Sequence, residues 1–132
     1  MVRMELRSIH INDTADRQYV TLAEKDGSRT LTIVIGWNEV QAIDRFVKGS
    51  PPPRPLTHEL TAALLEAVGA TLERVDVTEL KEGTFYALLR LTRADGVTVE
   101  VDARPSDALA LATALKKPVF VQEAVIEAAK DE

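Results

Sequence analysis

The chain has no cysteine among its 132 residues. This absence excludes a disulfide framework and a thiolate-bound zinc site, and it suits a protein of the cytoplasm, where disulfides are rare. Apolar runs are short: none approaches the ~20 residues of a membrane-spanning helix. Residues 1–11 alternate polar and apolar side chains, unlike the continuous apolar segment of a signal peptide. We therefore expect a cytoplasmic protein with no membrane segment.

Positive charge is also scarce. The chain has 16 lysines and arginines against 21 aspartates and glutamates, which gives a net charge of −5. Proteins that bind nucleic acid mainly by neutralising phosphates are usually basic, so tight non-specific binding is not expected here. Any activity on nucleic acid would need a local basic patch or a bound cation.

The common catalytic sequence motifs are absent as well. The sequence contains no glycine-rich dinucleotide loop, no P-loop, no nucleophile-elbow serine, no zinc-protease helix motif and no paired-cysteine motif. Ser106 has no adjacent histidine, so a serine triad is not indicated either. No single motif assigns a reaction.

The remaining composition is that of one soluble domain, with 45% hydrophobic and 28% charged residues. At this length, folding buries roughly two-thirds of the surface of the unfolded chain, enough for a core without cross-links. The proline-rich run at residues 50–53 is too short to separate two cores. We expect a single domain over residues 1–132.

Hydrophobic periodicity predicts the order of the elements. The expected elements are a strand at 1–11 with a bulge or bend near Arg7 and Ser8, strands at 18–23 and 30–35, a helix from Trp37 that stops at Gly49, a helix after Pro55 that stops at Gly69, strands at 71–80, 85–91 and 97–101, a helix from Pro105 to Lys116, a strand at 119–121 and a helix at 122–130. Consecutive strands joined by tight turns favour antiparallel pairing with helices on one side. The pattern therefore indicates an α+β fold.

The helix expected after Pro55 has apolar residues at helical spacing. We expect this set to face the core. It consists of Leu60, Ala63, Leu64, Ala67 and Val68.

Two segments contain most of the polar side chains that could do chemistry. They are residues 54–60, Arg-Pro-Leu-Thr-His-Glu-Leu, and residues 102–108, Asp-Ala-Arg-Pro-Ser-Asp-Ala. Each runs from Arg-Pro into small polar and acidic residues and then into a helical pattern. Proline presets φ and lacks an amide that the first turn would leave unpaired, so both segments predict helix starts.

Polar residues in these helix starts have ordinary structural roles as well as possible chemical ones. The hydroxyl of Thr57 or Ser106 can accept hydrogen bonds from first-turn amides. The carboxylate of Glu59 or Asp107 suits the positive end of a helix dipole. A structural network of caps and salt bridges therefore remains an alternative to any active site.

The chemical alternative is a phosphate site. Arg54 and Arg104 each precede a proline, and the planar guanidinium fork suits phosphate oxygens next to a helix N-terminus. If the two segments meet, they would form a phosphate-binding cradle. His58 would then be a general base or acid, because an imidazole ordinarily titrates near working pH.

Carboxylates at the same helix starts would repel a phosphate. A Mg²⁺ or Mn²⁺ ion would resolve this conflict, because hard cations bind carboxylate oxygens, attract phosphate and activate water. The expected ligands are Glu59, Asp102 and Asp107, with Glu39 as a more distant candidate. The spacing of these residues is not diagnostic of a metal.

Four blocks of the sequence resemble the bifunctional nuclease family, formerly described as a domain of unknown function. They are residues 35–43 (Ile-Gly-Trp-Asn-Glu-Val-Gln-Ala-Ile), 54–60, 102–112 (Asp-Ala-Arg-Pro-Ser-Asp-Ala-Leu-Ala-Leu-Ala) and 118–121 (Pro-Val-Phe-Val). Their order and spacing match from about Val2 to Ala128. Glu59 stands where many members have aspartate, and the strand before Gly36 reads Thr-Ile-Val-Ile instead of the commoner Pro-Ile-Trp-Ile.

The resemblance implies an α+β fold with a strongly bent, mainly antiparallel and partly barrel-like sheet, about four helices, a homodimer, and nuclease activity on DNA and RNA. Carried over residue by residue, it points to Glu39, Arg54, Thr57, His58, Glu59, Asp102, Arg104, Ser106 and Asp107.

Two functions are therefore expected. The first is low-specificity hydrolysis of phosphodiester bonds in DNA or RNA. Its catalytic residues would be His58, Glu59, Asp102 and Asp107, its substrate-binding residues Arg54, Thr57, Arg104 and Ser106, and its metal ligands Glu59, Asp102 and Asp107. The second is a non-enzymatic binding or regulatory module that uses the same polar pocket and a dimer interface, with Trp37 or Phe85 as a contact residue.

Overall fold

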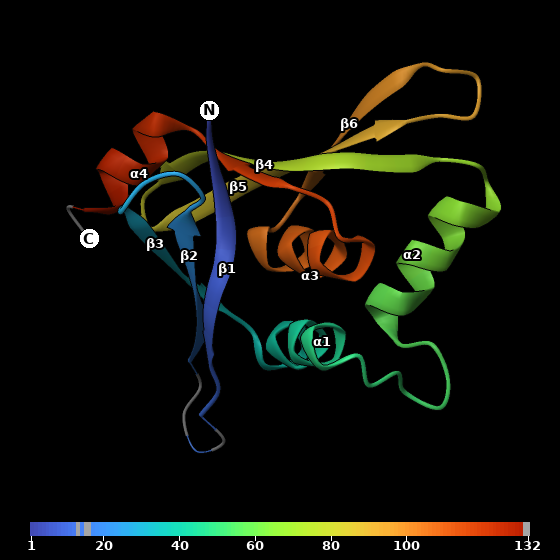
Figure 1. Ribbon diagram of the computed structural model, residues 1–132, viewed down its shortest axis with the longest axis horizontal. Coiled ribbons are helices and arrows are strands. Elements are labelled where there is room, and N and C mark those ends of the chain that lie inside the picture. Colours follow the sequence, from blue (N-terminus) through green and yellow to red (C-terminus); the bar gives the residue numbers. More distant parts are fainter. Residues whose placement is uncertain (13, 15–16, 131–132) are drawn as a thin grey trace.

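The computed structural model describes residues 1–12, 14 and 17–130 (Figure 1). The described chain forms seven strands and four helices, an α+β fold. In chain order these are β1 (Val2–His10), β2 (Gln18–Glu24), β3 (Thr30–Ile35), α1 (Trp37–Lys48), α2 (Thr57–Ala67), β4 (Thr71–Lys81), β5 (Thr84–Thr92), β6 (Thr98–Ala103), α3 (Pro105–Leu115), β7 (Val119–Val121) and α4 (Glu123–Ala129). No described helix has the length and apolar character needed to cross a membrane.

All seven strands belong to one curled sheet, a half-barrel with the order β3-β2-β1-β7-β4-β5-β6. Neighbouring strands pair antiparallel except β4 and β7, which are parallel. Figure 1 shows β1 crossing in front of β4 at a steep angle, with α3 in the angle between them. The bent, mainly antiparallel sheet that the family resemblance implied is confirmed.

Helix α3 is the centre of the core. Its residues 108–112 alternate alanine and leucine and are all at most 3% exposed. The small alanines allow other elements to approach closely, and α3 contacts α1, α2, β3, β4 and β5. Helix α1 covers it with a stripe that includes the fully buried Val40 and Ile43. A buried central helix fixes the position of its own N-terminus, where Arg104 and Asp107 lie.

Local sequence signals for bends and helix ends are largely confirmed. The pairing of β1 with β2 shifts register between Leu6 and Ser8, where a bulge or bend was expected. Helix α1 ends at Gly49, whose φ of 67° is the left-handed conformation that glycine adopts without steric cost. Helix α3 ends at Lys116, which adopts a similar conformation.

The predicted caps are wrong in detail. Helix α2 has Leu56 as its N-cap, and helix α3 has Arg104. Neither side chain carries an oxygen that could accept from the first-turn amides, and neither helix has a side-chain cap. Thr57 and Ser106 lie inside their helices, one and two residues beyond the cap position.

The orientation predicted for α2 is also wrong. Leu60, Leu64 and Val68 are 51%, 57% and 69% exposed, and Ala63 and Ala67 are exposed as well. The helix instead turns its other side to the core, where His58 is buried. Together with Leu56, which is 49% exposed, the three large residues form a row at intervals of four that we call the α2 stripe.

A buried carboxylate sits in the middle of the sheet. Asp76 of β4 is 0% exposed. Arg74 lies on the same strand with its Nε 3.0 Å from Asp76 Oδ1, and Arg90 of β5 donates to Asp76 Oδ2. Arg90 continues the chain of contacts to Glu100 of β6 at 2.6 Å. Three adjacent strands are thus joined by one set of ion pairs.

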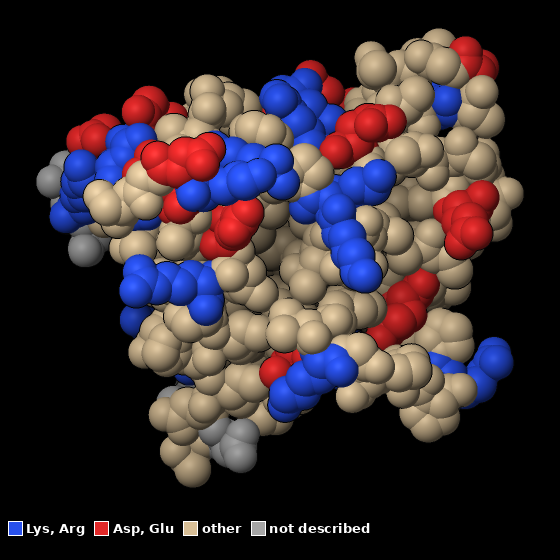
Figure 2. Space-filling view, in the orientation of Figure 1, with Lys and Arg blue, Asp and Glu red and all other residues tan. Residues whose placement is uncertain are grey.

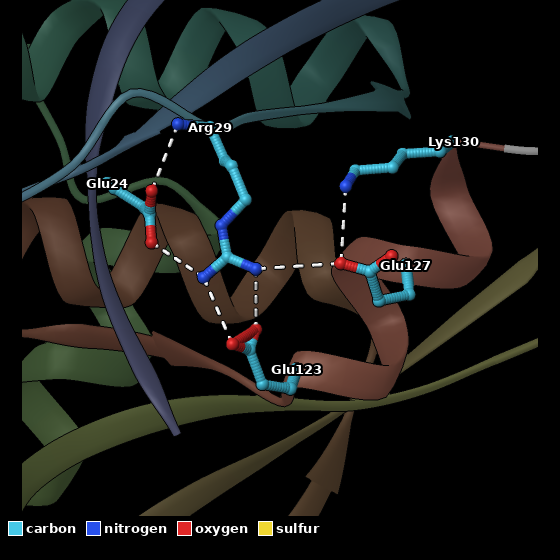
Figure 3. A network of polar contacts seen from close by, with 5 residues as sticks. All are labelled: Glu24, Arg29, Glu123, Glu127 and Lys130. Carbon is cyan, nitrogen blue, oxygen red and sulfur yellow. Dashed lines mark hydrogen bonds and ion pairs between the residues drawn. The ribbon is translucent and has the colours of Figure 1, made fainter.

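A second set of ion pairs fastens α4 to the β2–β3 turn (Figure 3). Arg29 donates at 2.7 Å to Glu24 and at 2.7 Å to Glu123, and it lies 3.6 Å from Glu127. The hydrogen bond from Arg29 lowers the pKa of Glu24 from 4.5 to about 2, and it also lowers the pKa of Glu123.

This arrangement predicts an acid-sensitive attachment of α4. Because the pKa of Glu24 is depressed in the folded state, its contribution to stability is complete above pH 4.5 and disappears as the pH falls towards 2. We expect Arg29→Ala to weaken the dependence of the urea midpoint on pH between 4.5 and 2, and to speed amide exchange in α4. Arg93→Ala, which removes an exposed pair with Asp95, is the control. Equal pH profiles for the Arg29 variant and the wild type would contradict the assignment.

Candidate functional site

The N-terminal ends of α1, α2 and α3 converge on one pocket of about 540 Å³. Helix N-termini present unpaired amides and a partial positive charge, so their convergence favours an anion. The polar residues that these ends contribute are Asn38 and Glu39 from α1, Thr57 and His58 from α2, and Arg104 and Asp107 from the start of α3. We call it the three-helix pocket.

A continuous chain of polar contacts crosses the pocket. His58 Nε2 lies 2.8 Å from Asp107 Oδ1, and Arg104 Nε donates at 2.9 Å to Asp107 Oδ2. Arg104 Nη2 is 3.7 Å from Glu39 Oε1. His58 is only 6% exposed, whereas the Arg104 side chain is 68% exposed. The imidazole is therefore fixed, and the guanidinium borders solvent.

The environment keeps Asp107 ionised. Burial alone would raise the pKa of Asp107, but hydrogen bonds from His58 and Arg104 outweigh it and hold the pKa below the ordinary value of 3.8. The same hydrogen bond raises the pKa of Arg104. A carboxylate can only accept, so the Nε2 atom of His58 carries the hydrogen in this contact. Nδ1 has no hydrogen-bond partner among the described residues.

Glu59 points away from this chain of contacts. Arg45 donates to its two carboxylate oxygens, each at 3.3 Å. Burial would raise the pKa of Glu59, but the hydrogen bond from Arg45 and those from backbone amides, including that of Leu56, lower it overall. Glu59 thus fastens the start of α2 to α1. Arg45 lines the pocket, and its role was not predicted because nothing in the sequence pairs it with residue 59.

Gly36, just before α1, provides room for Glu39. A Cβ placed on Gly36 would lie 2.3 Å from Glu39 Oε1, so the carboxylate folds back over the glycine. Glu39 is 9% exposed as a result. The Ile-Gly-Trp sequence therefore determines where this acidic group meets Arg104.

The structure brings together five of the nine residues that the resemblance indicated. They are Glu39, Thr57, His58, Arg104 and Asp107, all of which line the three-helix pocket. The other four lie elsewhere. Asp102 is exposed on β6, because side chains alternate along a strand and it is Ala103 that faces the pocket. Arg54 is exposed and makes no hydrogen bond or ion pair with the described residues. Ser106 lines a different groove.

The predicted metal triad is not assembled. Asp107 lines the pocket, Glu59 is paired with Arg45, and Asp102 is exposed on β6. Within residues 1–12, 14 and 17–130, no three histidine, cysteine, aspartate or glutamate side chains are grouped so that they could hold a metal ion. These three carboxylates do not fit a shared Mg²⁺ or Mn²⁺ ion.

The charges around this fold are mixed. Figure 2 shows lysine and arginine side chains alternating with acidic ones on the face that carries β1, without a wide basic surface there. Any basic site for nucleic acid on this face is therefore small.

A family model for the bifunctional nuclease domain matches residues 20–132. The chain belongs to the bifunctional nuclease domain family. The resemblance seen in the sequence blocks is confirmed.

This bifunctional nuclease domain is similar in sequence to proteins from a bacterium and from rice species. An uncharacterized protein found in two strains of Mycobacterium tuberculosis is 39% identical over 126 residues, which cover 96% of this chain and 74% of that protein. Bifunctional nuclease 1 of Oryza sativa and the bifunctional nuclease of Oryza minuta are 25% identical over 122 residues, which cover 90% of this chain and 37% of each plant protein. Family and relatives together suggest a nuclease-like function.

Proposed function

We propose that this domain hydrolyses phosphodiester bonds of DNA or RNA in the three-helix pocket, with low sequence specificity. The observation that carries the proposal is the contact chain His58–Asp107–Arg104 at the convergence of three helix N-termini. Contacts to phosphate hold a nucleic acid without reading its sequence, which accounts for low specificity.

Phosphate binding falls to Arg104, Thr57 and the first-turn amides. Arg104 uses its Nε for Asp107, and its Nη2 lies 3.7 Å from Glu39. Because the side chain is 68% exposed, its terminal nitrogens can also reach phosphate oxygens without releasing Asp107. Thr57 lines the same pocket with a hydroxyl that can donate to a third oxygen. The helix ends add positive potential at this point.

Proton transfer falls to His58. Asp107 accepts from Nε2, fixes the ring and stabilises the imidazolium that forms, which leaves Nδ1 to take a proton from water. The water oxygen bonds to phosphorus as the bond from phosphorus to the leaving sugar oxygen breaks. The leaving oxygen then receives a proton from the imidazolium or from solvent. This sequence uses only groups of the chain and water.

His58→Gln tests this assignment. Loss of the imidazole should lower hydrolysis of a fluorescently labelled oligonucleotide by roughly 10²-fold or more, because general acid–base catalysis contributes about that factor. Parallel reactions with EDTA, Mg²⁺ and Mn²⁺ test whether a divalent cation takes part, which stays a prediction. Full activity of the His58 variant would rule out the three-helix pocket as the site of hydrolysis.

We also infer that the domain is a homodimer that pairs through the α2 stripe. Four large apolar side chains, 49–69% exposed, form a continuous row on one helix, and monomers rarely expose such patches. A Cβ on Gly69 would lie 3.0 Å from that of Ala94, so the end of α2 reaches the β5–β6 turn. Val97, Val99 and Val101 add apolar residues 36–49% exposed just beyond that turn.

A second copy is the occupant that suits this surface. A row of similar side chains on a helix can pack against itself around a two-fold axis, which makes it self-complementary. Stable pairs bury about 800 Å² per partner, so the two apolar sets would form the centre of such an interface and their neighbours its rim. Leu56 belongs to the stripe and also lines the three-helix pocket, so pairing would place the partner beside the candidate site.

The oligomeric state tests this inference. Leu60→Glu with Leu64→Glu should convert a dimer to a monomer in sedimentation velocity experiments, because two buried charges would face each other across the axis. Val47→Glu is the matched control, since Val47 is 55% exposed on α1 and lies outside the stripe. A wild-type domain that sediments as a monomer at about 100 μM would contradict the inference, given the micromolar affinities of weak interfaces. A cytoplasmic location also stays a prediction.

A further inference from the structure

A second concave surface lies beside the three-helix pocket. It is a groove of about 980 Å³ that follows β3 and is bordered by the β4–β5 turn, the start of α3 and the end of α4. We call it the β3 groove. Arg104 lines both concavities, and consecutive residues divide between them: Ser106 faces the groove and Asp107 faces the pocket. At the start of α1, Gly36 and Asn38 are divided in the same way.

The charged residues that line the described part of the β3 groove are all basic, although the whole chain has a net charge of −5. Arg17, Arg104 and Lys130 line it, and none of its described lining residues is acidic. Lys130 also lies 3.2 Å from Glu127, and Arg104 binds Asp107. Arg17 has no ion pair with the described residues. This is the local basic patch that a nucleic-acid function would need in an acidic protein.

Ser106 supplies an independent sign of a ligand. It is 7% exposed in the first turn of α3, yet its Oγ has no hydrogen-bond partner among the described residues. The residue is buried on its other sides, so a partner for this hydroxyl can reach it only from the groove. Here the hydroxyl borders the groove beside first-turn amides and the positive end of the most buried helix. A phosphate oxygen would satisfy it at that place.

The shape of the groove favours a single strand. A concave channel of this size holds a few nucleotides, whereas duplex DNA accepts protruding helices or ribbons into a groove about 12 Å wide. Proteins that bind single strands combine a basic groove along the backbone with aromatic rings for base stacking. Phe85 lines the groove and is half-buried, and Thr30 and Thr32 of β3 line its wall.

We propose that the β3 groove binds single-stranded nucleic acid on one side of the cleaved bond. Ser106 Oγ and the first turn of α3 bind one phosphate, and Arg17 and Lys130 bind neighbouring ones. The strand then passes Arg104 and presents its next phosphodiester to His58. This assignment rests on the proposed function for the direction of the strand, but binding in the groove can be measured without hydrolysis.

Fluorescence anisotropy with a labelled single-stranded decamer tests the proposal, in the full chain carrying His58→Gln so that the probe is not cut. Arg17→Gln with Lys130→Gln should weaken binding about 10-fold and reduce the slope of log Kd against log salt by about 1 to 2, since two phosphate contacts are lost. Ser106→Ala should weaken binding about 3- to 10-fold with the slope unchanged, because it removes a hydrogen bond and no charge. Lys48→Gln with Arg93→Gln removes two positive charges outside the groove and is the matched control.

The outcomes separate this proposal from the proposed function. Weaker binding in the groove variants, with no hydrolysis by the wild type, would support the groove and contradict the enzyme. Hydrolysis by the wild type, with unchanged Kd and unchanged KM for the decamer in Arg17→Gln/Lys130→Gln, would overturn the groove alone. Equal affinity for a duplex decamer would overturn the single-strand assignment. A glutamate-rich peptide that competes with the decamer at equal affinity would point instead to an added peptide strand along β3 and would also overturn it.

Discussion

Replacing Asp107 with asparagine is expected to slow phosphodiester hydrolysis by roughly 10²- to 10⁴-fold, the usual contribution of general acid–base catalysis. Neutralising the carboxylate that orients a catalytic histidine can reach the upper end of this range, about 10⁴-fold. The side chain accepts from His58 and from Arg104 at 2.8 and 2.9 Å. An amide of the same shape can accept at only one atom, so one partner is lost and the imidazolium is no longer stabilised by charge. Protein yield and melting temperature should change little, because Asp107 lies at a partly exposed helix end.

Asp44→Asn is the matched control for this variant. Asp44 is paired with Lys48 at 2.9 Å, and its side chain is 23% exposed compared with 33% for Asp107. Asp102→Asn allows the two carboxylates of residues 102–108 to be compared. We expect a larger loss of hydrolysis rate for Asp107→Asn, because Asp107 lines the pocket and Asp102 does not. Because the pKa of Asp107 is below 3.8, its ionisation should not limit activity between pH 5 and 8. A rate for Asp107→Asn equal to that of Asp44→Asn would contradict the role given to the His58 contact.

Replacing Asp76 with alanine is expected to lower the free energy of unfolding by about 2–3 kcal/mol, somewhat less than the 3–5 kcal/mol typical of a broken buried ion pair. Asp76 is fully buried between Arg74 and Arg90. The loss leaves two guanidinium groups beside an empty space in the sheet. Both arginine side chains are 36% exposed, so water partly replaces the carboxylate, which is why the smaller figure is expected.

Urea unfolding of Asp76→Ala and Asp95→Ala compares the free energies of unfolding lost with a buried and with an exposed ion-paired aspartate. Asp95 forms a 2.6 Å pair with Arg93, but its side chain is 49% exposed, and exposed pairs contribute at most about 1 kcal/mol. If both variants unfold at the same urea concentration as the wild type, the buried position of Asp76 has no energetic consequence and the expectation is wrong.

The order of the elements could be read from the sequence because strong local signals mark it. Alternating apolar residues, the turn around Gly27 and the stop at Gly49 depend on neighbouring residues only. The side of α2 that faces the core could not be predicted from neighbouring residues. That helix has two usable sides, and packing against α3 selected the side with His58 over the more apolar one. The amphipathic pattern identifies the more apolar side of a helix, but it does not determine which side packs against the rest of the fold.

The candidate site was predictable to the extent that helix starts gather polar residues. The two segments do meet, through His58 and Asp107. Which residues of the two segments reach the pocket depends on the direction of each side chain, and spacing in the sequence does not predict that direction. Successive residues of a strand face opposite sides of the sheet, so Asp102 faces away from the pocket that Ala103 lines. One residue along a helix turns the side chain by about 100°, which put Ser106 and Asp107 into different concavities.

The sheet also has a consequence for how the chain reaches this fold. Val2 of β1 pairs with Val121 of β7, so residues about as far apart in sequence as this domain allows must find each other. The three residues of β7 also join β1 to β4, and they leave the ribosome after the other six strands. Closure therefore has high contact order and cannot begin before β7 has been synthesised. Until Val119–Val121 arrive, the nascent protein holds two separate three-stranded meanders with unprotected edges.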